Sequence, residues 1–141
     1  MATDNTAGFK FMYRLSGGPA TVQTLTFKDT ETLYKGDLVN LESGEIDLAA
    51  TGDTAFVGVV LETKSGTDST TTVEVITDSD AVYAVYDANA RAMGATLDLS
   101  GSAGAQGVTT SSNADFMVIA PSSADDWTLV TFNGKHFTAD N

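Results

Sequence analysis

Residues 33–61, LYKGDLVNLESGEIDLAATGDTAFVGVVL, decide the fold class of this chain. Two short apolar runs at 38–41 and 46–48 flank Ser43 and Gly44, and this spacing predicts a β-hairpin closed by a tight turn. The run 56–61 is apolar at nearly every position, which indicates a strand that is either buried on both faces or central in a barrel. Gly58 within it predicts a bend or close backbone packing. The stretch therefore predicts a hairpin followed by a central strand.

The rest of the chain repeats this pattern of short runs and turns. Threonine, glycine and valine are common, whereas Lys, Arg, Gln and Leu, which favour helices, are sparse. Asp87 as N-cap and Gly94 as terminator predict one short helix over 87–93. Leu25 and Phe27 are expected to face inward, and the end from 136 to 141 is expected to fray. Further strands are predicted at 9–15, 20–27, 71–76, 81–86, 116–120 and 127–132. The fold class predicted is all-β, a small β-barrel or β-tulip-like sandwich.

An N-terminal arm, residues 1–19, is predicted ahead of a single β-barrel domain at 20–141. Residues 1–8 are small and polar, which predicts a disordered tip. The segment 9–15 then alternates apolar and polar side chains like a half-buried strand. It gathers apolar surface and two cations in an acidic chain, so it is the candidate partner-binding site. The candidate residues are Phe9, Lys10, Phe11, Met12, Tyr13 and Arg14.

Two interpretations of this segment are open. It is either the first strand of the domain's own sheet, or an arm that adds a strand to the edge of a partner's sheet. In the second case the domain should remain folded without residues 1–15.

The charge balance bears on the class of partner. The 141 residues contain 19 Asp and Glu against 7 Lys and Arg, a net charge of −12. Phosphate groups repel such a surface, and the cations are scattered between Lys10 and Lys135, so neither nucleic acid nor membrane is predicted as a partner. Mutual repulsion suits a protein present in many copies. The absence of cysteine excludes disulfides and cysteine nucleophiles.

Candidate catalytic and metal-binding residues are few. His136, the one histidine, lies near the chain end beside Asn133-Gly134, a poor place to fix an imidazole. The acidic pairs Asp78/Asp80, Asp125/Asp126 and Glu42/Glu45 fall in turns and lack the spacing of an EF-hand loop. The glycine-rich stretch 101–107 contains no lysine and matches no phosphate-binding loop. The sequence therefore predicts no enzyme, no catalytic or metal-binding residue and no cofactor.

Several strings resemble the small β-barrel proteins of head-gene regions in tailed bacteriophages, which include the capsid decoration (cement) proteins. They are YKGDLV (34–39), SGEIDLAA (43–50), FVGVV (56–60), RAMGATLDL (91–99) and AGAQGV (103–108). The resemblance implies a β-tulip or related barrel, often a homotrimer, that binds the major capsid protein on the outer surface of the head through an N-terminal arm. It also implies synthesis in the host cytoplasm, which agrees with the absence of a signal sequence at the N-terminus.

Three other functions stay open at this point. One is another virion barrel, such as a tail component. A second is a carbohydrate- or calcium-binding module in which Trp127 or the pair Tyr83/Tyr86 stacks on a sugar. A third is a small hydrolase that uses Asp78/Asp80 or Asp125.

Overall fold

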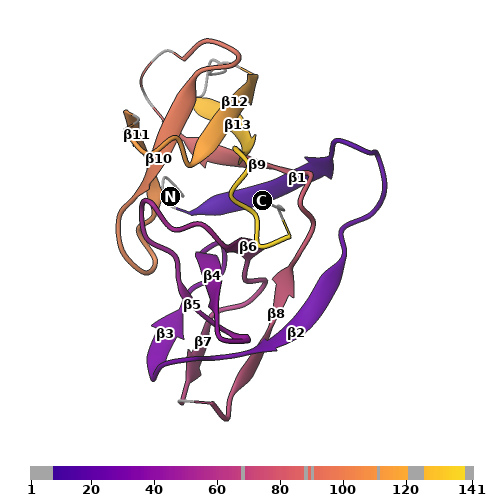
Figure 1. Cartoon of the computed structure of the whole chain (residues 1–141), viewed down its shortest axis with the longest axis vertical. Coiled ribbons are helices and arrows are strands. Elements are labelled where there is room, and N and C mark those ends of the chain that lie inside the picture. The colour runs from indigo at the N-terminus through magenta and orange to yellow at the C-terminus, as the bar shows by residue number, and fades with distance from the viewer. Residues whose placement is uncertain are drawn as a thin grey trace, which may run out of the picture.

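The computed structural model describes residues 8–67, 69–87, 89, 91–110, 112–120 and 126–138, and the secondary structure of this part is all β (Figure 1). The strands are β1 (Phe9–Arg14), β2 (Val22–Thr26), β3 (Glu31–Leu33), β4 (Leu38–Glu42), β5 (Glu45–Leu48), β6 (Phe56–Val59), β7 (Lys64–Gly66), β8 (Thr72–Ile76), β9 (Ala81–Tyr86), β10 (Thr96–Ser100), β11 (Gly107–Thr110), β12 (Phe116–Ala120) and β13 (Trp127–Phe132). The all-β prediction is confirmed. None of the described residues forms a helix, so none forms one long and apolar enough to cross a membrane.

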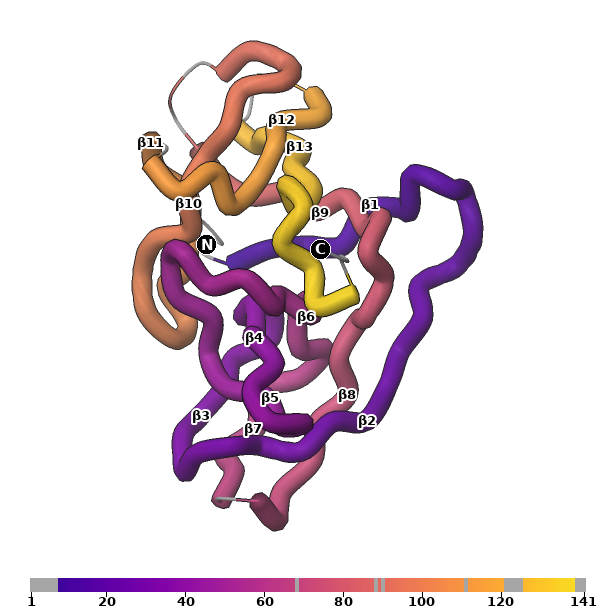
Figure 2. Tube along the Cα trace, in the orientation of Figure 1, coloured from indigo at the N-terminus to yellow at the C-terminus, as the bar shows by residue number. Residues whose placement is uncertain are grey.

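The strands form four antiparallel sheets that pack together as a sandwich (Figure 2). The largest has the order β1-β9-β13-β12-β10-β11, so β1 and β11 are its two edges. The smaller sheets have the orders β5-β4-β6, β2-β8 and β3-β7. They lie in the lower part of Figure 1, and the large sheet lies in the upper part. The chain crosses from the large sheet to the small ones directly after β1, which places β1 at the junction between them.

The predicted hairpin is confirmed as β4 and β5. Val39 lies opposite Leu48, and the turn falls at Ser43 and Gly44, as the sequence indicates. Ser43 has a φ of 52° and Gly44 one of 83°. Left-handed conformations at both central residues are typical of a type I′ turn, whose twist matches that of the flanking strands.

The strand β6 lies between two hydrophobic cores, which explains its unbroken apolar sequence. Phe56 and Val59 belong to a core packed under the large sheet, and Val57 belongs to a second core between the small sheets. The prediction of a strand buried on both faces is confirmed. At Gly58 a Cβ atom would overlap the carbonyl oxygen of Ile76, so the predicted close backbone packing is also confirmed.

The predicted helix at 87–93 is wrong for the residues that the structure describes there. The carboxylate of Asp87 accepts hydrogen bonds from the backbone N–H of Asn89 and from the guanidinium of Arg91. The backbone N–H of Asp87 donates to the carbonyl of Asp126. The N–H of Gly94 donates to the carbonyl of Val118. These long-range bonds occupy backbone groups and hold the segment in an irregular conformation.

The predicted fraying is wrong for residues 136–138, and residues 139–141 lie outside the described part. Phe56 donates its N–H to the carbonyl of Lys135, and Phe137 donates to the carbonyl of Phe56. The side chain of Phe137 packs against the second core. The chain end is therefore joined to β6 by backbone bonds and by packing.

Candidate partner-binding surface

The segment with the candidate binding residues is β1, and it lies in the domain's own sheet. It pairs antiparallel with β9, with Phe9 opposite Val85 and Arg14 opposite Ala81. The register shifts between Phe11 and Tyr13, so β1 has a bulge at this point. Residues 1–7 lie outside the described part, so the predicted disordered tip stays a prediction there. The structure thus places 9–14 as the ordinary first strand considered above.

The six candidate residues lie in different environments. Phe9 is only 3% exposed, and its ring centre lies 5.2 Å from that of Phe116 in the core. Phe11 is half-buried and meets Tyr83 edge to face. Met12 and Tyr13 are 47% and 43% exposed. Lys10 is also exposed, and Arg14 is half-buried. Phe9 is therefore a core residue, and the side chains that a partner can reach are mainly those of Lys10, Met12 and Tyr13.

Arg14 fastens the end of β1 to the turn between β8 and β9. Its Nε lies 2.7 Å from Oδ1 of Asp80 and 3.4 Å from Oδ1 of Asp78. Asp80 also accepts the N–H of Ser16, and Asp78 accepts that of Thr21. Burial opposes ionisation of Asp80, but the bonds from Arg14 and Ser16 outweigh it and lower its pKa to about 2. Both carboxylates of the pair Asp78/Asp80 are therefore engaged by groups of the fold itself, namely Arg14, Ser16 and Thr21.

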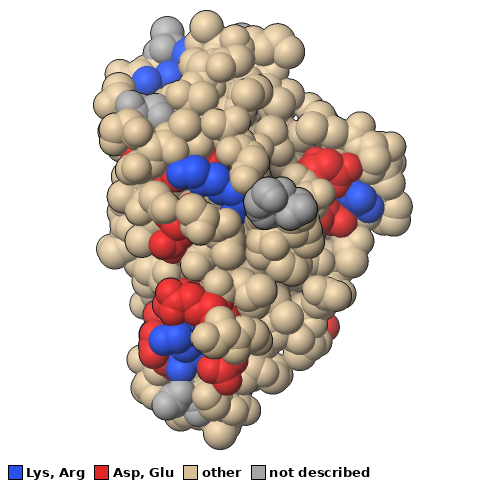
Figure 3. All heavy atoms as spheres, in the orientation of Figure 1, with Lys and Arg blue, Asp and Glu red and all other residues tan. Residues whose placement is uncertain are grey.

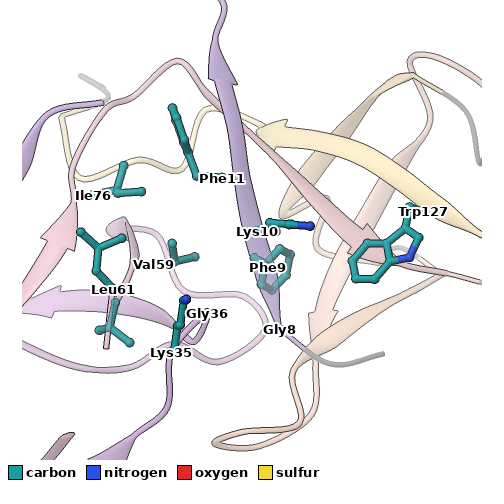
Figure 4. A pocket seen from close by; sticks show the side chains of 11 residues that line it. Gly8, Phe9, Lys10, Phe11, Lys35, Gly36, Val59, Leu61, Ile76 and Trp127 are labelled. Carbon is teal, nitrogen blue, oxygen red and sulfur yellow. The ribbon is translucent and has the colours of Figure 1, made fainter. Parts of the chain in front are cut away.

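A pocket of about 450 Å³ opens beside β1 (Figure 4). Segments far apart in the sequence line it: residues 8–11, 35–36, 59–61, Ile76 and Trp127. The view shows Phe11, Val59, Leu61 and Ile76 on one side of the β1 ribbon, and Lys10 and Trp127 on the other. Among the described residues, the lining includes two lysines, Lys10 and Lys35, and no Asp or Glu. The pocket is therefore an apolar groove with cations at its rim, in a chain of net charge −12.

Acidic side chains gather elsewhere, at the end of the molecule formed by β3 and β5 (Figure 3). Nζ of Lys28 lies 3.5 Å from Glu42 and 3.9 Å from Asp29. Asp47 of β5 is close to them, and burial together with repulsion from Glu42, Asp29 and Asp53 raises its pKa to about 6. Across the described ranges, no three His, Asp or Glu side chains are placed to hold a metal ion.

We expect Asp47→Asn to raise the melting temperature at pH 7.5 and to have little effect at pH 4. The pKa of Asp47 is higher in the folded chain than its ordinary value, so the folded state retains a proton that the unfolded state releases between about pH 4 and 6. The free energy of unfolding therefore falls as the pH rises through this window, and asparagine removes the loss. Thermal melts at both pH values measure the effect.

The control for this experiment is Asp80→Asn, which should lower the melting temperature at pH 7.5. The pKa of Asp80 is lowered, so its carboxylate stabilises the fold above about pH 4 and loses this contribution as the pH falls towards 2. If the Asp47→Asn chain melts no higher than the original at pH 7.5, the ionised carboxylate of Asp47 does not destabilise the fold.

The aromatic candidates for sugar stacking are separated by the fold. Tyr83 is fully buried in the first core, so its ring cannot stack on a sugar, and this part of the carbohydrate hypothesis is wrong. Tyr86 and Trp127 are half-buried and pack edge to face, with ring centres 6.1 Å apart. Trp127 also lines the groove beside β1. Of the three candidates, Trp127 is the one that lines this groove.

The imidazole of His136 is fixed, in contrast to the expectation from its place near the chain end. The side chain is buried, Nε2 donates to the carbonyl of Val57 at 3.1 Å, and Nδ1 accepts the N–H of Thr138 at 3.2 Å. Burial lowers the pKa of His136, which favours the neutral ring that these bonds require. Its hydrogen-bond partners are the carbonyl of Val57 and the N–H and hydroxyl of Thr138.

The groove itself was not predicted from the sequence. In the sequence, Lys35 and Gly36 precede the predicted hairpin, and 59–61 form the end of the predicted buried strand. No local signal joins them to β1, because the groove forms only where Gly36 accepts the N–H of Phe9 at 2.9 Å. The positive charge of Lys10 beside an aromatic-rich strand was the single hint available.

The chain is similar to known proteins at the level of the fold. No protein-family model and no curated protein sequence matches the chain. The fold is similar to a solved structure, that of the head fiber gp8.5 N base in bacteriophage phi29. The similarity has a TM-score of 0.52 at 15% sequence identity, and it covers 80% of this chain and 95% of that chain. The two chains share a fold.

Proposed function

We propose that the chain is a structural protein of a phage particle, without enzymatic activity, that binds the outer surface of the head and stabilises the capsid. The observation that carries this proposal is the likeness of fold to the phi29 head fiber base, which extends over 95% of that chain. The acidic composition supports it, because repulsion between copies keeps an abundant surface protein dispersed. The engagement of His136 and of Asp78/Asp80 by structural partners is in keeping with a protein that does no chemistry.

The partners in this proposal are the major capsid protein and further copies of the chain, most simply as a homotrimer. Copies arranged with the symmetry of the head would each contribute a modest interface, and linked copies gain avidity through effective concentration. The proposed contact surface is the exposed part of β1 and its continuation, which consists of Lys10, Met12, Tyr13 and Leu15. Phe9 is excluded because it is buried.

Co-sedimentation with expanded heads of the source phage tests this function. We expect the purified chain to bind saturably, and a Met12→Ser/Tyr13→Ser chain to bind about tenfold more weakly, because it loses exposed apolar surface at the proposed contact. Met93→Ser is the matched control, since Met93 is exposed and lies between β9 and β10, away from β1. If the unaltered chain does not sediment with heads, the proposal fails.

One specific observation favours a second function, a carbohydrate-binding module. Trp127 lines a pocket and is half-exposed, as a sugar-stacking residue must be. A glycan array separates the two functions: binding that Trp127→Ala abolishes would favour the carbohydrate module. The calcium hypothesis is tested by melting the chain with and without Ca²⁺, where a shift in melting temperature would support it.

A further inference from the structure

We propose that the groove beside β1 binds an extended segment of a partner protein, with alternating apolar and acidic side chains, as an additional strand on the free edge of β1. This inference deepens the proposed function and rests on it only for the identity of the partner. The binding chemistry is argued from the groove alone.

β1 is an edge strand, and β9 is its one neighbour among the described strands of the sheet. The N–H of Phe9 donates to Gly36, so the peptide groups of Phe9 point away from β9. Phe11 follows two residues later in regular register, and in an antiparallel pair such residues point to the same side. No described strand pairs with Phe11 on that side. Its N–H and C=O are therefore placed to pair with an added strand.

An open pocket lies beside that edge of β1. The pocket of about 450 Å³ lies within the range of about 300–1,000 Å³ that is usual for ligand-binding clefts. Its wall on one side of β1 is apolar, formed by Phe11, Val59, Leu61 and Ile76 (Figure 4). Leu61 is 37% exposed, so part of this wall is open to solvent. The space is suited to apolar side chains of an incoming strand.

The charged side chains that line the groove are positive. Lys10 and Lys35 are both exposed and both line the groove, and none of the acidic residues that the structure describes lines it. Two of the seven cations thus lie at one groove in a chain with 19 acidic residues. Such a local excess of positive charge favours an acidic partner and disfavours a basic one.

The apolar wall and the positive charge of Lys10 lie on opposite sides of β1 (Figure 4). Side chains of a strand point alternately to opposite faces. In Figure 4 the apolar wall lies on one side of β1, whereas Lys10 and Trp127 lie on the other. A strand added along β1 would place every second side chain against the apolar wall and the intervening ones near Lys10. The segment that fits best alternates apolar and acidic residues, such as Val-Glu-Val-Glu.

A fluorescence titration tests the inference, because Trp127 lines the groove and is the one tryptophan of the chain. The probe is the capped peptide Val-Glu-Val-Glu-Val-Glu-Val. We expect a saturable change in emission that weakens as salt is added. Two comparison peptides should produce no saturable change. One has Lys in place of every Glu and loses charge complementarity, and the other has proline in place of the valine at its third position and loses strand pairing.

Matched variants locate the binding site. Lys10→Glu should weaken peptide binding at least tenfold, whereas Lys64→Glu should leave it unchanged, because Lys64 lies on β7 and does not line the groove. Both variants change the net charge equally, and thermal melts confirm that both are folded. Equal weakening by the two variants, or equal binding of the lysine peptide, would overturn the proposal by showing that binding is not directed to the groove.

Failure of this inference is distinguishable from failure of the proposed function. If the acidic peptide causes no saturable change while the chain still binds heads, the proposed binding at the groove is wrong and the proposed function is unaffected. Peptide binding without head binding would support the groove and reject the function. Ultracentrifugation of the chain alone examines another occupant: if Lys10→Glu abolishes self-association and the peptide does not bind, a second copy of the chain occupies the groove and the proposal is wrong.

Discussion

Phe9→Ala is expected to lower the free energy of unfolding by about 3–5 kcal/mol, the usual cost of truncating a buried phenylalanine. The Phe9 ring lies in the first core beside Phe116 and Tyr83, and its backbone N–H pairs with Gly36. Removal of residues 1–15 would also delete the whole strand β1 and expose β9. Because a domain of this size is stable by only about 5–15 kcal/mol, we expect the shortened chain not to fold.

Chemical denaturation measures the first effect, and circular dichroism with size-exclusion chromatography measures the second. Met12→Ala is the matched control on the same strand: its side chain is largely exposed, so we expect a change within about 0.5 kcal/mol. A folded, cooperatively melting chain without residues 1–15 would contradict the placement of β1 in the sheet. It would restore the interpretation of this segment as an arm outside the domain.

Asp115→Ala is expected to destabilise the fold by about 3–5 kcal/mol, because it leaves a partly buried cation and several backbone groups without their partner. Asp115 is 0% exposed. Its carboxylate lies 2.9 Å from Nζ of Lys135 and accepts the N–H of Leu99 at 2.9 Å and that of Gly52 at 3.2 Å. One side chain thus joins β10, the loop after β5 and the chain end.

The comparison for Asp115 is an exposed ion pair. Glu42→Gln disrupts the contact between Glu42 and Lys28, and we expect a loss below about 1 kcal/mol from equilibrium unfolding. A double change, Asp115→Ala with Lys135→Met, removes both charges and should be less destabilising than Asp115→Ala alone. If Asp115→Ala costs no more than Glu42→Gln, the buried network does not support the fold as described.

The parts of the fold that the sequence predicts well are those in which local chemistry dictates the structure. The β4–β5 hairpin follows from Ser43-Gly44, whose left-handed conformations a turn of this type requires. The strand β6 follows from its unbroken apolar run. In contrast, β3, β7 and β11 have three or four residues and a largely polar sequence, so no periodicity shows them. β3 and β7 pair with each other although they are far apart in the sequence, and β11 pairs with β10 just before it. Gly66 of β7 also lies against the ring of Phe27, where no side chain would fit.

The sequence predicts the strand that carries the candidate residues, and their binding to a partner stays a prediction. The strand that carries Lys10, Met12 and Tyr13 could be predicted, because alternation along 9–15 is a local signal, and these three side chains are exposed. Alternation does not show which residues lie in the core, and so Phe9 was included in the candidate site. The groove could not be predicted, because it brings Lys35, Leu61 and Trp127 together from three separate segments.

Electron cryo-microscopy of expanded phage heads incubated with the purified chain would show whether the chain binds the outer head surface. We expect one copy or a symmetric cluster of copies at equivalent positions on the outer surface, with the β1 edge facing the shell or a neighbouring copy. Heads that show no added density at saturating protein, or density at the tail alone, would contradict the claim that this chain is a protein of the outer head surface.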